Sequence, residues 1–277
     1  MAATEAAGPL GIIAGSGDLP RFLIEACRGT GRAVYVVALQ GETDPRIVTG
    51  VPHAWCRLGA GAALVDTLHT NGVRDLVLAG GVKRPSLAAL RPDWRAAKFI
   101  ARVGYRALGD DGLLSAVVAE LEREGFCVIG AHEVLDTAAL PEGPLGNCRP
   151  DADAAADIEQ GFRLARAIGA LDLGQAVVIQ QGLVLGVEAI EGTDALIRRC
   201  AALHRSGPGG VLVKAEKPGQ ERRADRPTIG PQTVAVAAVG GLQGIAAEAR
   251  ATLVLDRDEV IRAADAAGLF VVGIRAP

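Results

Sequence analysis

The densest group of charged side chains in the sequence lies in one loop of the second half of the chain. Between residues 214 and 231, five cations and three acids follow a predicted strand and precede a helix that starts at a proline. Cations can bind phosphate oxygens, and a carboxylate can hold Mg²⁺ or a water molecule, as phosphoryl transfer requires. A solvated polar loop is the alternative interpretation, because runs of charge usually face water.

Three carboxylates precede this loop in the chain. Glu188, Glu191 and Asp194 occupy the junction between a predicted strand and a predicted helix. Carboxylates that converge at such a junction can bind a hard cation. For Asp194, a role as the helix cap is the alternative.

A glycine-rich turn near the N-terminus is suited to phosphate. Gly15-Ser16-Gly17-Asp18 follows a short apolar run and opens a helix, where free N–H groups and the helix dipole favour an anion. The dinucleotide fingerprint is imperfect, because Pro20 replaces the third glycine and Leu39-Gln40 ends the second strand where NAD binders place an acid. NAD is therefore disfavoured. A purely structural turn with Asp18 as helix cap is the alternative.

A second glycine-rich loop, Gly80-Gly81-Val82-Lys83, follows a later predicted strand. In a parallel sheet this loop shares an edge with the first, and two such loops can hold one ligand. Lys83 can neutralise a phosphate, with a solvated lysine as the alternative. The motif Gly109-Asp110-Asp111-Gly112 offers paired carboxylates that can bind a metal ion or cap the next helix.

The helix expected from Pro92 carries a basic stripe beside an apolar one. The cations recur at spacings of three, four and four residues. They are Arg95, Lys98, Arg102 and Arg106, and the apolar stripe is Trp94, Ala97, Ala101, Tyr105 and Leu108. A solvated face is the usual meaning of this pattern, and contact with anionic lipid headgroups is the more specific one.

The elements that position these groups alternate along the first half of the chain. Apolar runs separated by helical spacing predict a parallel sheet with right-handed crossovers. Thirty-six glycines fit the many tight turns of such a fold. The expected strands are residues 10–14, 33–39, 54–58, 75–79 and 126–130, and the expected helices are residues 19–27, 62–70 and 92–124, the last interrupted near Gly109.

A second α/β region follows residues 136–150. Prolines and glycines crowd this stretch, which is typical of a linker, so we divide the chain into a domain over 1–135, a linker over 136–150 and a domain over 151–277. The fold class predicted is α/β in two domains. In the second domain the expected strands are residues 176–179, 183–188, 210–214, 251–255 and 270–274, and the expected helices are residues 151–168 and 194–203 with two more from 231 and after 256.

Composition limits the functions that the chain can have. The formal charge of −3 gives no basic field, so nucleic-acid binding is disfavoured. Five scattered cysteines suit reduced thiols in the cytosol, and no Cys or His spacing suits zinc, so a bound metal should be a hard one. No run approaches the ~20 apolar residues that cross a bilayer. We therefore expect a cytoplasmic protein.

Four motifs occur in order along nearly the whole chain: GIIAGSGDLP from Gly11, GDDGLL from Gly109, VEAIEGTD from Val187 and DRPTIGP from Asp225. Together they resemble the LpxI family, the UDP-2,3-diacylglucosamine pyrophosphatases of lipid A biosynthesis. The resemblance implies a Rossmann-like N-terminal domain, a linker and a C-terminal α/β domain, with substrate held between the domains.

The resemblance also implies Mg²⁺-dependent hydrolysis of UDP-2,3-diacylglucosamine to UMP and 2,3-diacylglucosamine 1-phosphate (lipid X), with water attacking the β-phosphorus. The family's essential aspartate falls on Asp225, the expected catalytic residue. Glu188 and Asp194 join Asp225 as expected metal ligands. The expected substrate-binding residues are Gly15, Ser16, Gly17, Asp18, Gly81, Lys83, Asp111, Gln181, Thr193, Lys214, Lys217, Arg223 and Thr228.

Three positions depart from the family's pattern. Glu221 and Arg226 stand where an aspartate and an apolar residue are expected, and Leu196 stands where methionine is expected. These departures concern the flanks of the charged loop more than Asp225 itself.

Other classes of function stay open. The residues alone indicate a cytosolic Mg²⁺-dependent phosphoryl-transfer enzyme acting on a nucleotide or a sugar phosphate. An NAD(P)-dependent dehydrogenase and a non-catalytic nucleotide-sugar or lipid carrier are the alternatives; the missing acid counts against the first, and Asp225 among cations counts against the second. The expected partners are UDP-2,3-diacylglucosamine, the cytoplasmic face of the inner membrane, bound peripherally, and a second copy of the chain.

Overall fold

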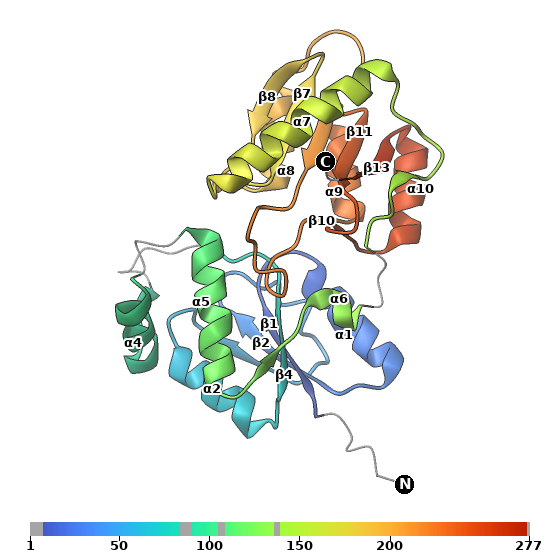
Figure 1. The fold of residues 1–277 in the computed structure, drawn as a ribbon. Helices are drawn as coiled ribbons and strands as arrows, with labels where there is room; N and C mark the ends of the chain where they lie inside the picture. The colour runs from blue at the N-terminus through green and yellow to red at the C-terminus, as the bar shows by residue number, and fades with distance from the viewer. Residues whose placement is uncertain (1–7, 84–89, 105–108, 136–138, 276–277) are drawn as a thin grey trace. The chain divides into compact units, whose positions relative to one another are not determined.

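The computed structural model describes residues 8–83, 90–104, 109–135 and 139–275 (Figure 1). The chain divides into two compact units. Unit 1 comprises Met1–Asp136 together with Glu221–Asp225, and unit 2 comprises Thr137–Gln220 and Arg226–Pro277. Each unit combines helices with a sheet, which confirms the predicted α/β class in two domains.

Unit 1 contains a five-stranded sheet in the order β3-β2-β1-β4-β5. Every neighbouring pair is parallel, as the alternation of strands and helices predicts. The chain moves outward from β1 in both directions, so the order reverses between β1 and β4, and this order is the Rossmann-like one. The strands are β1 (Leu10–Ala14), β2 (Val34–Leu39), β3 (His53–Cys56), β4 (Asp75–Ala79) and β5 (Cys127–Val128).

Helices cover both faces of this sheet. Figure 1 shows α1 and α6 on one side and α2, α4 and α5 on the other, as right-handed crossovers in opposite directions from β1 require. The long helix expected over 92–124 is two helices, α4 and α5. The helices of unit 1 are α1 (Leu19–Thr30), α2 (Gly61–Thr70), α4 (Trp94–Val103), α5 (Asp110–Arg123) and α6 (Ala131–Val134).

Unit 2 contains a mixed six-stranded sheet in the order β6-β13-β11-β9-β7-β8. Its centre, β9, β11 and β13, is parallel, and antiparallel strands flank that centre on each side. A separate parallel pair joins β10 to β12. The strands are β6 (Gly143–Leu145), β7 (Ala176–Gln180), β8 (Leu183–Val187), β9 (Val211–Lys214), β10 (Thr228–Ile229), β11 (Gly244–Glu248), β12 (Leu253–Val254) and β13 (Phe270–Ile274).

The core of unit 2 has two layers, one on each face of the sheet. Val177 and Ile179 of β7 pack in a cluster with α7 (Ala152–Ala170), whereas Ala176 and Val178 pack on the opposite side. That opposite layer is covered by α8 (Thr193–Ala201), α9 (Pro231–Val239) and α10 (Arg257–Ala267). Alternate residues of each central strand are therefore buried against different helices, and the sheet is apolar on both faces.

Two parts of unit 2 differ from the sequence prediction. The stretch assigned to a linker contains β6, which pairs with β13, and Leu140 within it is fully buried. Strand β11 was not predicted, although it lies near the centre of the sheet, while the strand expected over 251–255 shrinks to β12 in a separate pair. Pairing and burial by distant strands override the local composition at these places.

None of the helices in the described ranges is long and apolar enough to cross a bilayer.

Candidate active site

The two glycine-rich loops of unit 1 meet at the carboxyl edge of the sheet, between β1 and β4. The backbones of Ser16 and Gly81 exchange two hydrogen bonds, of 2.8 and 3.0 Å, and the Ser16 hydroxyl donates to the same Gly81 carbonyl at 2.9 Å. A Cβ on Gly15 would lie 2.3 Å from the Gly81 carbonyl oxygen, and one on Gly80 would lie 2.2 Å from that of Ser16. The loops are therefore adjacent, as predicted, and glycine is needed to bring them together.

Gly17 differs from these structural glycines. Its φ is +86°, and a Cβ there would meet no atom within 4 Å. Asp18, the next residue, occupies the N-cap position of α1, as the structural alternative expects, but its side chain makes no capping hydrogen bond to the helix. Ser16, Gly17 and Asp18 are exposed, and the first turn of α1 begins directly behind them. Such an exposed helix start suits an anion.

Two other predicted residues of unit 1 lie near the limits of the described chain. Lys83 is exposed and follows the second glycine loop, immediately before residues 84–89, which fall outside the description. Asp111 lies in the first turn of α5, and its side chain is outside the description.

The carboxyl edge of the unit 2 sheet carries a buried polar network. Lys214 ends β9 and is 5% exposed; its Nζ donates to Thr193 Oγ1 and to the carbonyl oxygen of Thr228, each at 3.1 Å. The Thr193 hydroxyl donates at 2.6 Å to Glu188, whose other oxygen accepts the Gln175 N–H at 2.9 Å. Glu188, Thr193, Lys214 and Thr228, all predicted site residues, are thus connected.

A second set of contacts pins the start of the charged loop to the same unit. Glu248, at the end of β11, accepts the backbone N–H of Glu216 at 2.9 Å. Lys217 is 9% exposed and donates from Nζ to Asp172 at 2.9 Å. Lys217 therefore lies close to the predicted network in sequence but is engaged in an ion pair beside α7. The loop is anchored rather than freely solvated. Glu248 does not stand out in the sequence, because β11, which it ends, has no recognisable strand pattern.

Gln181 lies away from this network. It occupies the β7–β8 turn, beyond Ile179, which pairs with the first residue of β9, Val211. Because Lys214 ends β9, Gln181 lies at the opposite edge of the sheet. Its backbone N–H donates to Asp157 at 2.8 Å and its side chain to the Ser206 carbonyl at 3.0 Å. These contacts hold the hairpin.

The segment that contains Asp225 groups with unit 1. Arg223 forms two 2.9 Å hydrogen bonds to the two carboxylate oxygens of Glu221 and a 2.6 Å bond to Glu122 of α5. The paired guanidinium lowers the pKa of Glu221 from its ordinary value and raises the pKa of Arg223. Asp225 is half-buried, and its N–H donates to the Glu221 carbonyl at 2.9 Å. Arg223 thus anchors the turn that presents Asp225.

Arg226, on the other side of Asp225, is anchored within unit 2. Its guanidinium donates to the carbonyl oxygens of Ala251 at 2.9 Å and of Arg250 at 2.6 Å. The polar side chain at this departure from the family's pattern therefore has a structural partner, the turn before β12. In the sequence, Asp225 lies two residues after Arg223 and directly before Arg226.

The three predicted metal ligands occupy different surroundings. Both Glu188 oxygens accept hydrogen bonds within the network. Asp194 lies in the first turn of α8, behind the N-cap Gly192, and pairs with Arg198 at 3.6 Å. Among the residues that the structure describes, no three His, Cys, Asp or Glu side chains form a metal-binding group. The set of Asp225, Glu188 and Asp194 therefore stays a prediction.

Together, a parallel sheet with a glycine-lined edge and a mixed sheet with a buried cation at its carboxyl edge define an α/β protein suited to a phosphate-bearing ligand. Residues 9–138 match the model of the LpxI N-terminal domain, and residues 141–272 match that of the LpxI C-terminal domain. The chain therefore belongs to the LpxI family. Among curated proteins, the UDP-2,3-diacylglucosamine pyrophosphatase LpxI of Caulobacter vibrioides is 45% identical over 272 residues, covering 96% of this chain and 97% of that relative.

Proposed function

We propose that this hydrolase of the LpxI family cleaves the pyrophosphate bond of UDP-2,3-diacylglucosamine, yielding UMP and lipid X. The observation that carries the proposal is the match along both domains to a family whose curated member bears this activity in its name. The glycine-lined edge of unit 1 and the buried Lys214 network of unit 2 support it, because each offers donors to phosphate oxygens.

In unit 1, the donors proposed for substrate are backbone groups. The N–H of Ser16 is used by Gly81, whereas no acceptor in the described chain receives the N–H of Gly17 or Asp18. These two groups, at the start of α1, can donate to a phosphate oxygen. Gly17 leaves open space there because it has no side chain.

In unit 2, Lys214 is the donor proposed for substrate. Its ammonium group uses two of three hydrogens on Thr193 and Thr228, which fixes the direction of the third. Glu188 orients Thr193 by accepting its hydroxyl proton. Thr193 and Glu188 therefore act as positioning residues for the cation.

For the chemical step we propose that water attacks the β-phosphorus, which carries the diacylglucosamine. The new P–O bond forms to the water oxygen, the bond from the β-phosphorus to the bridging oxygen breaks, and that oxygen leaves on UMP. Asp225 orients the water and accepts its proton. Asp225 is a half-buried residue on an anchored turn, which supports this role.

We further propose that Mg²⁺ is required. Mg²⁺ in proteins is commonly held by one or two carboxylates together with substrate phosphates, so Asp225 alone is a sufficient protein ligand. Glu188 and Asp194 are the further ligands proposed, and in the structure they contact Thr193, Gln175 and Arg198. When bound, the ion would neutralise charge on the phosphate oxygens.

The test is hydrolysis of UDP-2,3-diacylglucosamine in ¹⁸O-water, with Mg²⁺ and with a chelator. We expect one ¹⁸O in the phosphate of lipid X, none in UMP, and loss of turnover in the chelator. Label in UMP would overturn attack at the β-phosphorus, and full turnover in the chelator would overturn the metal requirement. Binding without turnover would favour a carrier, and reduction of NAD(P) would favour a dehydrogenase.

Asp225→Ala tests the catalytic assignment. We expect turnover to fall by about 10²–10⁴-fold, because a lost ligand or base typically costs that much. The melting temperature should stay near that of the wild type, since Asp225 lies in a loop. Asp258→Asn, an exposed acid on α10, is the control and should keep full turnover. If Asp225→Ala kept half of the wild-type turnover, the assignment of Asp225 as the catalytic residue would be wrong.

We also propose that the protein works in the cytoplasm at the surface of the inner membrane. The proposed substrate carries two acyl chains, and burial of each CH₂ is worth ~0.8 kcal/mol, so the substrate resides in a bilayer. Sedimentation of the protein with vesicles checks this proposal.

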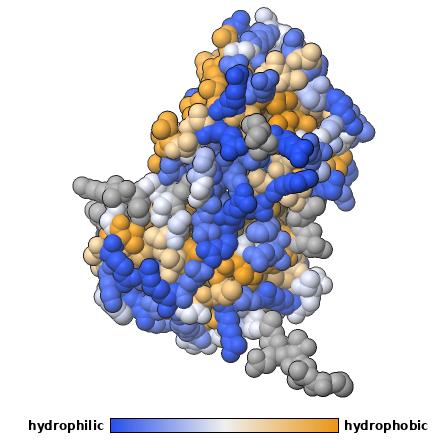
Figure 2. Space-filling model, viewed as in Figure 1, coloured by the Kyte–Doolittle hydropathy of each residue, from blue (hydrophilic) through white to orange (hydrophobic). Residues whose placement is uncertain are grey.

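The homodimer stays a prediction. Figure 2 shows hydrophobic side chains at the surface over β8 and the adjoining end of α7. Strand β8 is an edge strand, and its Leu183, Val184 and Val187 are each at least 40% exposed. An exposed apolar edge is a surface on which a second chain can pair. Analytical ultracentrifugation of the wild type and Val184→Lys would show whether a dimer forms and whether it uses β8.

A further inference from the structure

Helix α4 lies at the surface of unit 1, beside α2 and α5. No side chain of this helix is fully buried. Phe99, Ile100 and Val103 form its half-buried inner seam. Asp93 fixes its start, because one carboxylate oxygen caps α4 through Ala96 at 2.9 Å and the other accepts the N–H of Ala62, in α2, at 2.7 Å.

The outer face of α4 combines an aromatic ring with small residues and cations. Trp94 is 66% exposed. Ala97 and Ala101 are also exposed and follow Trp94 at helical spacing, with Lys98 beside them. The described part of the apolar stripe, which is Trp94, Ala97 and Ala101, therefore faces outward. An exposed indole on the apolar stripe of a helix that also carries cations is typical of helices that lie in a membrane interface.

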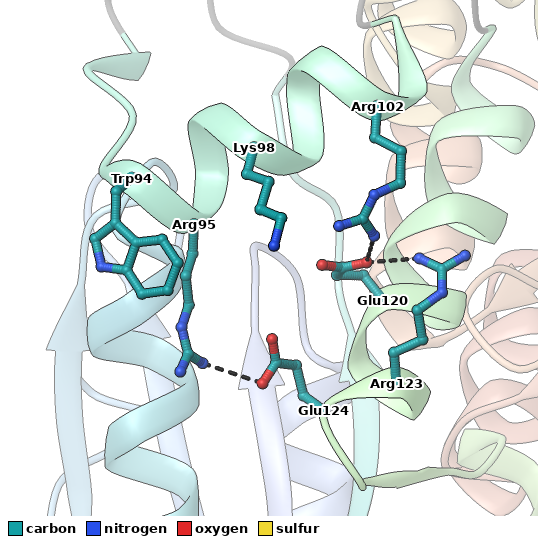
Figure 3. Close-up of a pocket in the computed structure, with 7 residues that line it drawn as sticks. All are labelled: Trp94, Arg95, Lys98, Arg102, Glu120, Arg123 and Glu124. Carbon is teal, nitrogen blue, oxygen red and sulfur yellow. Dashed lines mark hydrogen bonds and ion pairs between the residues drawn. The ribbon is translucent and has the colours of Figure 1, made fainter.

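Next to this face, a pocket of about 200 Å³ lies between α4 and α5 (Figure 3). Four cations and two carboxylates line it with Trp94. The full set is Trp94, Arg95, Lys98, Arg102, Glu120, Arg123 and Glu124.

Positive charge is in excess at one end of this pocket. Arg102 and Arg123 share a single oxygen of Glu120, each at 2.6 Å. Figure 3 shows Lys98 extending into the space between the two helices, and Lys98 forms no ion pair with any residue that the structure describes. Three cations therefore face one carboxylate.

At the other end the charge is balanced. Arg95 lies 3.1 Å from Glu124 and 3.8 Å from Asp66. The charge of Arg95, one of the cations of the basic stripe, is thus compensated by two carboxylates. Arg106 lies outside the described residues.

We propose that the cationic end of this pocket binds the phosphate of an anionic phospholipid headgroup, while Trp94 enters the interfacial region of the bilayer. This inference rests on the proposed membrane association and assigns a surface to it. Among the described residues Lys98 has no ion-pair partner, so its charge can attract a phosphate, and Arg102 and Arg123 add N–H donors to the phosphate oxygens. The adjacent exposed indole and alanines favour a bilayer over a free anion, because a free anion would gain nothing from them.

The chain's two tryptophans provide the test. In Trp55→Phe, Trp94 is the only indole, and its emission should shift to the blue and be quenched by brominated lipid when phosphatidylglycerol vesicles are added. In the matched Trp94→Phe, the remaining Trp55, 39% exposed on β3, should not respond. Neutral phosphatidylcholine vesicles and inorganic phosphate should leave Trp94 nearly unchanged.

Lys98→Glu supplies a second readout. It should weaken binding to anionic vesicles by about 5–30-fold at low salt, since each interfacial cation contributes around one kcal/mol and the substitution reverses a charge. Arg163→Glu, an exposed cation on α7, changes the net charge equally and should have a much smaller effect. Turnover on detergent-dispersed substrate should match the wild type in both variants.

The outcomes separate the proposals. If the wild type binds vesicles while Trp94 is silent and Lys98→Glu binds normally, this surface is wrong and membrane association stands. If the wild type binds no vesicles, both fail, and turnover on dispersed substrate still judges the hydrolase. An equal response of Trp94 to inorganic phosphate would overturn the headgroup assignment in favour of a free-anion site.

Discussion

The carboxyl edges of the two sheets differ in the groups that form them, backbone in unit 1 and charged side chains in unit 2. In unit 1 the edge consists of glycine backbone, where Gly15 and Gly80 let two loops exchange hydrogen bonds. In unit 2 the edge consists of side chains, with Lys214 and Glu188 buried around Thr193. Both arrangements can hold phosphate oxygens, one through N–H groups and a helix dipole and the other through a charge.

The two edges should therefore respond differently to mutation. A backbone site depends on local conformation, so substitution harms it through a Cβ or through φ. A buried ionic network depends on every member, because removal of one leaves a buried polar group without its partner.

The largest effect is expected at Lys214. Lys214→Met keeps the approximate length and the apolar stem of the side chain but removes the ammonium group, which donates hydrogen bonds to Thr193 and Thr228. We expect the free energy of unfolding to fall by roughly 2–3 kcal/mol, because Glu188 stays buried without a nearby cation. Turnover should fall by about 10²-fold or more. Urea unfolding and a turnover assay measure the two effects.

The double variant Lys214→Met/Glu188→Gln provides the control for that network. Neutralising Glu188 should recover part of the lost stability without recovering turnover. If the double variant is less stable than Lys214→Met, the two charges do not depend on each other and the contrast between the edges is weakened.

An intermediate effect is expected at two glycines with matched backbone strain. Gly17 and Gly80 have φ of +86° and +90°, so alanine is strained by a similar amount at each, about 1–2 kcal/mol. Only at Gly80 would the new Cβ meet backbone, 2.2 Å from the Ser16 carbonyl oxygen. Gly80→Ala should therefore lower the melting temperature clearly more than Gly17→Ala.

Ligand affinity should separate the same glycines in the opposite sense. The larger Gly17→Val should fold and yet bind the uridine nucleotide markedly more weakly in calorimetry, because its side chain fills the space proposed for a phosphate. If Gly17→Val binds the nucleotide as the wild type does, the turn is purely structural.

The smallest effect concerns the anchored turn before Asp225. The pKa of Glu221 lies below its ordinary value of 4.5, because Arg223 hydrogen-bonds the charged carboxylate. A lowered folded-state pKa means that the contribution to stability is complete above about pH 4.5 and is lost as the pH falls through the lowered value. Since Arg223 and Glu122 are more than a third exposed, the gain stays below about 1 kcal/mol.

Arg223→Gln checks this anchor. A carboxyl NMR titration should show the pKa of Glu221 rising toward its ordinary value, and turnover should drop only a few-fold. A titration identical to that of the wild type would mean that the ion pair does not hold the turn in solution.

Several features could be predicted from the sequence because they depend on neighbouring residues. The strands β1, β2 and β4 follow continuous apolar runs, and the glycines after β1 and β4 mark turns in any parallel arrangement. Strand β11 could not be recognised, since Gly244-Ile245-Ala246-Ala247 has little β propensity and owes its place to burial between β9 and β13.

The predicted linker is wrong for a related reason. Prolines and glycines between residues 141 and 150 are typical of a linker, yet Gly143–Leu145 pairs along β13 as an edge strand, a position where proline is tolerated. The residues around β6 give no indication of this pairing, because the partner strand β13 is more than a hundred residues away in the sequence.

The α/β class, the two glycine turns and the LpxI resemblance can be recognised from the sequence alone, because each resides in short runs of residues. The role of Asp225 stays a prediction. The tertiary structure decided which charged groups are joined and which are apart. Lys214 meets Thr193 from 21 residues away and Arg223 meets Glu122 from 101, whereas Gln181 falls at the opposite edge of the sheet. Contacts of that kind follow from strand order and burial, so they cannot be predicted from the spacing of residues along the chain.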